Sequence, residues 1–280
     1  MTSYRRSSLA KPFLKWAGGK RQLLPEITKH IPKFGTYYEP FVGAGAVLFK
    51  LQPQKAVIND SNFELMNCYQ VIKDNLDDLL ADLQKHKNNE NYYYRIRKLD
   101  RNVKEYNKLT PVEKASRIIF LNKTCYNGLF RVNSQGQFNV PFGRYKNPNI
   151  LNKSVLKAVH RYLNKNDVKI LNEDFETAVQ DGKKGDFVYF DPPYDPVSDT
   201  ASFTGYDING FDRNEQKRLK KVYDRLTEKG VKCLLSNSAT DFILDLYSKY
   251  KPILIVSASR NINSVAEKRG KISEVLVKNW

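Results

Sequence analysis

Short apolar runs with the length of strands alternate with amphipathic, helix-like stretches in residues 12–60 and again beyond residue 167. The apolar runs lie at Tyr37–Glu39, 56–59, 168–171, Phe187–Phe190, 231–235 and 253–256. The helical patterns include 20–30, Ala46–Leu51 and Arg213–Glu228. This alternation predicts an α/β fold, in which helices cover both faces of a parallel sheet. A last apolar run, 272–277, follows a loop where no helix fits, so we expect an antiparallel hairpin at the end of the sheet.

Residues 61–150 interrupt this pattern. Their helical patterns lie at 63–73, 76–85, 92–100 and 111–125, and a segment rich in Gly, Asn and Pro follows at 126–149. We interpret residues 61–150 as a mostly helical domain inserted into an α/β domain that residues 1–60 and 151–280 form together.

The charge of the chain favours a polyanionic partner. Its 47 Lys and Arg residues outnumber its 30 Asp and Glu residues, for a formal net charge of +17. Nucleic acid and an anionic membrane surface both fit such an excess, and a basic protein without such a partner is the alternative. An apolar fraction of 41%, with 17 Tyr and 15 Phe, is sufficient for a packed core and argues against disorder.

The sequence disfavours several other classes of protein. The basic segment 1–13 lacks the apolar stretch of a signal peptide, and no apolar run approaches the length of a transmembrane helix. The three cysteines and three histidines are isolated, so they indicate neither a disulfide framework nor a metal site. We therefore expect a protein of the reducing cytoplasm, with no metal and no membrane partner.

The motif EPFVGAG, residues 39–45, predicts a cofactor-binding turn. Gly43 and Gly45 directly follow a predicted strand, and small residues there let a ligand approach the backbone and the helix N-terminus. Asp60 ends the next strand, where it can accept hydrogen bonds from ribose hydroxyls. The pair suits an adenosine-containing cofactor. It does not suit NAD, because Leu48 stands where the dinucleotide fingerprint has its third glycine.

The motif KWAGGK, residues 15–20, predicts an anion-binding turn. The two glycines make the turn flexible, and Lys20 stands at the start of the predicted helix, where the helix N-terminus would help it to hold a carboxylate. The indole of Trp16 could face a base or a cofactor, but a place in the core fits it equally well.

The motif DPPY, residues 191–194, ends the buried strand Phe187–Phe190 on a stiff turn, because each proline fixes φ and lacks an N–H group. If the substrate is the exocyclic amine of a flipped-out base, the Asp191 carboxylate and the Pro192 carbonyl can accept its two hydrogens. Tyr194 can then stack on the ring. Pro192 and Pro193 hold the acceptors still, so little reorganisation is needed during the reaction. An ordinary strand-ending loop is the alternative.

Residues 122–150 combine basic and aromatic side chains with many Asn residues. Arg and Asn form bidentate hydrogen bonds with guanine and adenine edges, and aromatic rings can wedge into a base stack. We interpret the segment as a hairpin that reads DNA, with a polar hairpin on an aromatic anchor as the alternative.

Taken in this order, KWAGGK, EPFVGAG, the block YNGL-R-N…G-FNVPFGRY and DPPY resemble the Dam-type DNA adenine-N6 methyltransferases. The resemblance runs from about Phe13 to Val277, and it is specific because all four motifs stand in register. It implies a Rossmann-like methyltransferase sheet and S-adenosylmethionine as the methyl donor. It also implies a monomer that methylates N6 of an adenine flipped out of double-stranded DNA, within GATC.

The resemblance also implies roles for individual residues. The catalytic turn comprises Asp191, Pro192, Pro193 and Tyr194. The cofactor site comprises Trp16, Lys20, Glu39, Phe41, Gly43, Gly45, Asp60, Asp174, Phe175 and Asp191. The DNA-binding residues are Lys15, Tyr126, Asn127, Leu129, Arg131, Asn133, Pro141, Arg144 and Tyr145, with Arg131 reading guanine. Further phosphate contacts are expected from Arg260, Lys268, Arg269 and Lys271. Glu173 and Asp195 depart from the family pattern.

Two other functions stay open at this point. One is a methyltransferase acting on RNA or on a glutamine side chain, although related turns for such substrates carry Asn where this chain has Asp191. The other is a non-catalytic DNA-binding protein that kept the fold, and cofactor binding would separate it from an enzyme.

Overall fold

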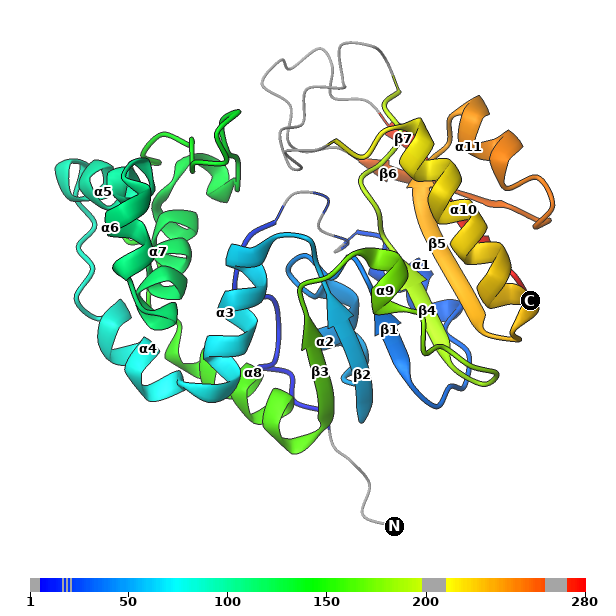
Figure 1. Cartoon of the computed structure of the whole chain (residues 1–280), viewed down its shortest axis with the longest axis horizontal. Helices are drawn as coiled ribbons and strands as arrows, with labels where there is room; N and C mark the ends of the chain where they lie inside the picture. The colour runs from blue at the N-terminus through cyan, green and yellow to red at the C-terminus, as the bar shows by residue number, and fades with distance from the viewer. Residues whose placement is uncertain (1–5, 17, 19, 21, 198–209, 260–270) are drawn as a thin grey trace.

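The computed structural model describes residues 6–16, 18, 20, 22–197, 210–259 and 271–280, and the described residues contain a seven-stranded sheet (Figure 1). Its order is β3-β2-β1-β4-β5-β7-β6. The strands are β1 (Tyr37–Glu39), β2 (Lys55–Asn59), β3 (Asp167–Leu171), β4 (Phe187–Phe190), β5 (Lys232–Ser238), β6 (Leu254–Ser259) and β7 (Lys271–Lys278). The first five are parallel, and β7 runs antiparallel between β5 and β6. The predicted parallel sheet and the C-terminal hairpin are both confirmed.

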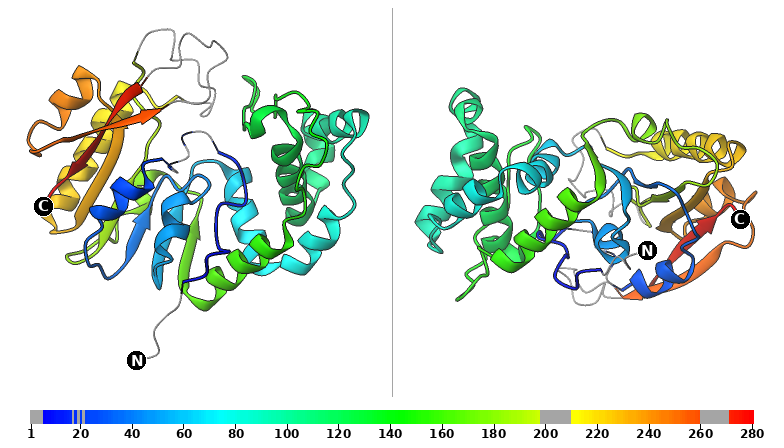
Figure 2. Two further views of the ribbon diagram at one scale, coloured as in Figure 1. Left: turned by 180° about the vertical axis from the view of Figure 1, so that it is seen from behind. Right: turned by 90° about the horizontal axis from the view of Figure 1, so that it is seen from below.

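Both faces of the sheet are buried. In β4, Phe187 and Tyr189 belong to one hydrophobic core, whereas Val188 and Phe190 belong to a second core. Side chains alternate across a strand, so a strand buried on both faces has an unbroken apolar run, as β4 does. Residues of α1 (Leu24–Lys29), α2 (Ala46–Leu51) and α3 (Phe63–Asp74) pack in the first core. Residues of α9 (Phe175–Ala178), α10 (Arg213–Glu228) and α11 (Asp241–Leu246) pack in the second (Figure 2).

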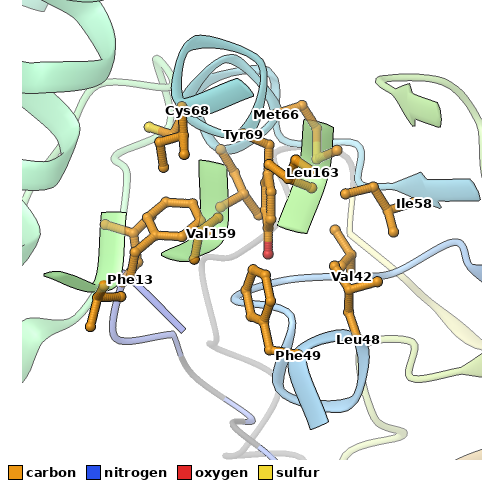
Figure 3. Packing of buried hydrophobic residues seen from close by; sticks show 14 of the residues in the cluster. Phe13, Val42, Leu48, Phe49, Ile58, Met66, Cys68, Tyr69, Val159 and Leu163 are labelled. Carbon is orange, nitrogen blue, oxygen red and sulfur yellow. The ribbon is translucent and has the colours of Figure 1, made fainter. Parts of the chain in front are cut away.

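Further helices lie beside the sheet, next to α3 (Figure 1). They are α4 (Leu76–Leu83), α5 (Glu90–Arg97), η1 (Lys98–Arg101), α6 (Val103–Lys108) and α7 (Pro111–Thr124). The buried residues of α4, α5 and α7 share the first core with α3, whose Tyr69 packs against Phe49 of α2 (Figure 3). The helices α4, α5 and α7 agree with predicted helical stretches, whereas α6 has no predicted counterpart. The boundaries of an inserted domain stay a prediction. Among the described residues, no helix is long and apolar enough to cross a membrane.

Two further helices differ from the sequence prediction. The helix predicted at 20–30 is shorter, because α1 begins at Leu24. Pro25 is the reason, since proline is tolerated in the first turn of a helix but not in its interior. Lys20 therefore precedes the helix, and the predicted help from a helix N-terminus is wrong. In addition, α8 (Lys153–Lys165) has no predicted counterpart, although its apolar residues recur with helical spacing and Asn152 caps it.

Candidate active site

The predicted catalytic and cofactor residues meet at one edge of the sheet. Glu39 ends β1, Asp60 follows β2, Asp174 follows β3 and Asp191 follows β4. These are the carboxyl ends of neighbouring parallel strands. Ligands of open α/β sheets bind at this edge, where the strand order reverses. In this sheet the order reverses between β1 and β4, so the motifs around Gly43 and Asp191 lie beside that point.

The carboxylate of Asp191 has two hydrogen-bond donors. Lys20 Nζ lies 2.7 Å from Asp191 Oδ1, and Ser236 Oγ donates to the same oxygen at 2.9 Å. The Lys20 and Asp191 side chains are only 8% and 18% exposed. Burial raises the pKa of Asp191 above its ordinary value of 3.8, although Lys20 and Ser236 act in the opposite direction. The site thus holds a carboxylate that takes up a proton more readily than an exposed aspartate does.

Tyr194 lies beside the same lysine. Lys20 Nζ is 4.4 Å from the centre of the Tyr194 ring, a distance typical of a cation–π contact. The Tyr194 hydroxyl donates a hydrogen bond to Glu274 Oε2 of β7 at 2.8 Å. Burial raises the pKa of Tyr194 well above its ordinary value, and the nearby Asp191 adds to this effect. The hydroxyl therefore stays protonated, and Lys20 occupies the space between the carboxylate and the ring.

The glycine turn after β1 can be formed only by residues without a side chain. Gly43 and Gly45 have φ values of 49° and 73°. A Cβ atom on Gly45 would lie 2.6 Å from the Tyr69 hydroxyl oxygen and 2.9 Å from the Phe49 ring, two side chains that Figure 3 shows together. A Cβ atom on Gly43 would lie 3.0 Å from the Trp16 ring. The turn therefore packs against aromatic rings on one side.

Side chains at the end of β2 tie this turn to its neighbours. The Asp60 carboxylate accepts hydrogen bonds from the Gly43 and Asn62 N–H groups, both at 3.0 Å. The buried Asn59 amide accepts from the Glu173 N–H at 2.8 Å and donates to the Glu173 carbonyl at 3.0 Å. The loops after β1, β2 and β3 are therefore held in register.

The loop after β3 adds an aromatic wall. Phe175 lies 5.4 Å from Phe41 and 5.9 Å from Phe211, measured between ring centres. Asp174 pairs with Arg218, whose guanidinium also lies 4.3 Å from the centre of the Phe175 ring. The predicted cofactor residues Phe41, Asp174 and Phe175 are thus brought together.

Glu39 is buried at the end of β1. Its Oε2 accepts a hydrogen bond from the Tyr37 hydroxyl at 2.9 Å. Burial raises the pKa of Glu39 well above its ordinary value. Glu39 is thus bound to its own strand by a hydrogen bond and holds a proton more readily than an exposed glutamate does.

The predicted DNA-binding residues lie partly against the N-terminal segment. The buried Asn122 amide accepts from the Lys15 N–H and donates to the Lys15 carbonyl, both at 2.8 Å. Lys15 Nζ lies 5.2 Å from the Tyr145 ring, and Trp16 stacks on Phe130 with ring centres 4.8 Å apart. Trp16 therefore joins this block to the glycine turn, which explains why both a core and a functional role fit it.

Several side chains of the block hold its own backbone. Arg131 donates to the Asn139 carbonyl through Nε at 3.1 Å and through Nη2 at 2.6 Å. Asn133 accepts from the N–H groups of residues 135 and 137, so its side chain forms the hairpin tip. The Pro141 carbonyl accepts the Tyr126 N–H at 2.8 Å.

Other residues of the block have different surroundings. Tyr126 and Arg144 are 54% and 79% exposed. Leu129 is partly buried, and Asn127 has a φ of 54°.

The loop predicted to contact phosphates is outside the described residues, as are Arg260, Lys268 and Arg269 within it. Lys271 begins β7, and only its backbone is described.

The polar end of β5 lies beyond the predicted strand. The strand continues beyond the predicted 231–235 through Ser236, Asn237 and Ser238, all of which are fully buried. Asp195, whose side chain is 1% exposed, packs here with its carboxylate against Arg213. The sequence does contain a signal for this feature, which is three polar residues directly after an apolar run. Polar groups at the carboxyl end of a buried parallel strand reach the ligand-binding edge.

Comparisons with known proteins agree with this geometry. The model of the D12 class N6 adenine-specific DNA methyltransferase family matches residues 16–262. The chain is 46% identical over 273 residues to the Type II methyltransferase M1.LlaDCHI of Lactococcus lactis subsp. cremoris, covering 96% of this chain and 95% of that protein. It is 44% identical over 291 residues to the Type II methyltransferase M.MjaIII of Methanocaldococcus jannaschii, covering 96% and 99%. It is 34% identical over 271 residues to the DNA adenine methylase of Escherichia coli (strain K12), covering 95% and 94%.

Proposed function

Because the chain belongs to the D12 class of N6 adenine-specific DNA methyltransferases, we propose that it methylates N6 of an adenine flipped out of double-stranded DNA, within GATC. One observation carries the reaction. Asp191 and Tyr194 flank Lys20 at the carboxyl end of β4, at the edge that also holds the Gly43 turn. The GATC target follows from the resemblance of residues 122–150 to the Dam-type recognition block.

The residues at this edge fit S-adenosylmethionine, which supplies an electrophilic methyl group on a sulfonium when bound. The turn with Gly43 and Gly45 at positive φ lies at this edge and offers its backbone to a ligand. Asp60 carries, at the end of β2, carboxylate oxygens of the kind that accept hydrogen bonds from ribose hydroxyls. Phe41 and Phe175 offer ring faces to an adenine, and Lys20 is the cation for a carboxylate.

The catalytic turn orients the amine and takes its proton. The Asp191 carboxylate and the Pro192 carbonyl accept the two hydrogens of N6, which aims the nitrogen lone pair along the line of attack. The neutral amine is the nucleophile, so no strong base is needed before attack. When the new N–C bond forms, N6 carries one proton too many, and Asp191 takes it. The raised pKa of this carboxyl makes it a better acceptor than an ordinary aspartate.

Lys20 has to change partners in this scheme. Its Nζ lies on Asp191 Oδ1 and over the ring of Tyr194, the two places that the adenine needs. With S-adenosylmethionine bound, Lys20 would pair with the carboxylate of the cofactor. The Asp191 carboxylate and the face of the Tyr194 ring would then be available to the adenine. Cofactor binding therefore prepares the site for the base.

DNA binding is assigned to the exposed face of residues 122–146 together with Lys15. Flipping is required because N6 is paired inside the duplex, and it costs a few kcal/mol. Tyr126 and Arg144 are the exposed candidates for the base stack and the phosphates. The net charge of +17 supports a phosphate partner. We expect the enzyme to act as a monomer.

The test measures transfer of labelled methyl groups to three duplexes. One contains GATC, one has the same composition in scrambled order, and one carries GATC already N6-methylated on both strands. We expect label in the first duplex alone. Label in the scrambled duplex as well would contradict the GATC assignment and keep the methyltransferase. No label in any duplex would contradict the proposed reaction and move the search to RNA and protein substrates.

A further inference from the structure

Two buried amide side chains hold the backbone on both sides of Tyr194. Gln216 Nε2 of α10 donates to the Pro193 carbonyl at 2.8 Å. On the other side, the Asp195 N–H donates to Asn237 Oδ1 of β5 at 3.0 Å. The two amides also bond to each other, because Asn237 Nδ2 donates to Gln216 Oε1 at 3.1 Å. A continuous chain of hydrogen bonds therefore runs from Pro193 to Asp195 through two side chains.

Packing alone does not explain these amides. Gln216 and Asn237 are fully buried, on elements whose other buried residues are mainly apolar, such as Leu219 in α10 and Leu235 in β5. Burying an amide is unfavourable unless its groups find partners, and an apolar residue would avoid that cost. The partners here are the backbone groups of the catalytic turn, the other amide and, for Asn237, the Ser238 N–H group at 2.9 Å.

Asp195, which follows Tyr194, is itself held by several hydrogen bonds. Its carboxylate accepts from Arg213 Nε at 3.0 Å and from Thr240 Oγ1 at 2.7 Å. Its carbonyl accepts from the hydroxyl of Ser238. The residue that departs from the family pattern is thus fixed to the start of α10 and to the N-cap of α11.

The two amides restrain backbone angles that the prolines leave free. A proline ring fixes its own φ but leaves ψ free. The bond from Gln216 to the Pro193 carbonyl restrains ψ of Pro193, and the bond from the Asp195 N–H to Asn237 restrains ψ of Tyr194. With both restrained, the direction in which the Tyr194 ring leaves the backbone is set.

We propose that Gln216 and Asn237 are positioning residues for methyl transfer, which hold the Tyr194 ring at the angle that the flipped adenine requires. The inference rests on the proposed function. It predicts that loss of the hydrogen bonds through Gln216 and Asn237 slows the chemical step. The binding of cofactor and DNA should stay unchanged, since neither amide lies on an exposed surface.

The test compares Gln216→Met with Val222→Ala. Met has nearly the shape of Gln but cannot donate to the Pro193 carbonyl. Val222 is also a buried residue of α10, and Val222→Ala creates a cavity without removing any of the hydrogen bonds between the two amides and the turn. Transfer is measured in a single turnover on the GATC duplex, and dissociation constants for DNA and S-adenosylmethionine are measured in parallel. We expect Gln216→Met to be about 10- to 100-fold slower with both constants unchanged, because small errors of placement have effects of that size. Val222→Ala should keep the wild-type rate while it is folded.

Two further variants complete the design. Gln216→Leu also lacks a donor for the Pro193 carbonyl and has a different shape, so the same slowing is expected even if Gln216→Met does not fold. Asn237→Ala combined with Gln216→Met should be no slower than the slower single variant, because both break one chain. An unslowed Gln216→Met or Gln216→Leu protein would overturn the inference while the wild type methylates the duplex. A wild type that labels no duplex would contradict the proposed function itself, and the inference with it.

Discussion

The catalytic edge and the recognition block are built differently. At the catalytic edge, residues 39–45, 60 and 191–195, polar groups are bound by buried side chains from other elements, such as Ser236 and Asn59. In the recognition block, residues 122–146, the backbone is folded by its own hydrogen bonds and by side chains of α5 and η1, and Tyr126 and Arg144 are exposed. The first region is held by tertiary contacts, and the second carries side chains at the surface.

This difference corresponds to the two tasks of the enzyme. Methyl transfer needs acceptors that do not move during the reaction, so their partners have to be fixed within the protein. Reading a base needs donors that can reach the DNA, so exposed side chains are suitable. Changes at the catalytic edge should therefore lower the rate or the stability, and changes in the block should alter the choice of sequence.

The largest effect is expected for Asp191→Ala. It removes the proposed acceptor of the amine hydrogens and the partner of Lys20. We expect methyl transfer to fall by at least about 10²-fold, the usual effect of losing one preorganised polar group in an active site. DNA binding, measured by titration of a labelled duplex, should remain. Asp191→Asn, which keeps an oxygen in place, is the control and should lose less. Full activity of Asp191→Ala would exclude Asp191 from catalysis.

A pair of glycine substitutions tests whether a change at the catalytic edge lowers stability more than a change in the recognition block does. Gly45→Ala forces a Cβ atom against the Tyr69 hydroxyl and the Phe49 ring at a φ of 73°. We expect it to lower the free energy of unfolding by about 2–4 kcal/mol, from strain and overpacking together. Gly128→Ala, at a φ of 63°, places a Cβ atom 2.2 Å from Lys15 Cδ, a contact that rotation of the Lys15 side chain can relieve, and 3.0 Å from Lys15 Cβ, which needs only a small shift. It should cost only about 1–2 kcal/mol. Urea unfolding measures both, and equal losses would contradict the distinction between the regions.

In the recognition block, Arg131→Ala should change sequence preference more than affinity. We expect it to reduce discrimination between GATC and a duplex altered at the guanine by about 1–3 kcal/mol. Lys146→Ala, an exposed neighbour, is the matched control and should weaken binding to both duplexes equally. Competition binding at fixed salt measures both ratios. An unchanged preference in Arg131→Ala would leave Arg131 only its observed role of holding the Asn139 carbonyl.

The smallest effect concerns pH. Asp191 has to be ionised to accept hydrogens, and burial raises its pKa above 3.8, so activity should fall on the acid side at a higher pH than an ordinary aspartate would give. The Ser236 hydroxyl lowers this pKa, so Ser236→Ala should move the acid limb of kcat/KM further up. Tyr189→Phe removes another partner of Ser236 and leaves the bond to Asp191, so its acid limb should stay in place. An acid limb that Ser236→Ala leaves unmoved would exclude Asp191 as the titrating group.

The raised pKa also affects stability. The folded protein binds the Asp191 proton more tightly than the unfolded chain does. Asp191 therefore favours folding most below its ordinary pKa, and this contribution is lost as the pH rises through the raised value. Stability and activity thus change in opposite directions with the ionisation of the same group.

The local pattern of the sequence determined the elements and the motifs. The continuous apolar run of β4 and the helical spacing of apolar residues in α10 reflect burial, because the positions that face a core are apolar. The glycine turn and the two prolines are likewise local, because they concern the φ angles of single residues. The motifs in register were sufficient to indicate the family.

Only the tertiary structure decided which groups act together. Lys20 meets Asp191, and Asn237 meets Asp195, across separations that no local pattern encodes. The extent of β5 also depended on neighbours, since Ser236 and Asn237 are polar and still buried. Their hydrogen-bond partners come from other strands and helices, and a polar residue is stable in a core only where the fold supplies such partners. The chemistry of the turn was therefore readable from the sequence, and the network that holds the turn in place was not.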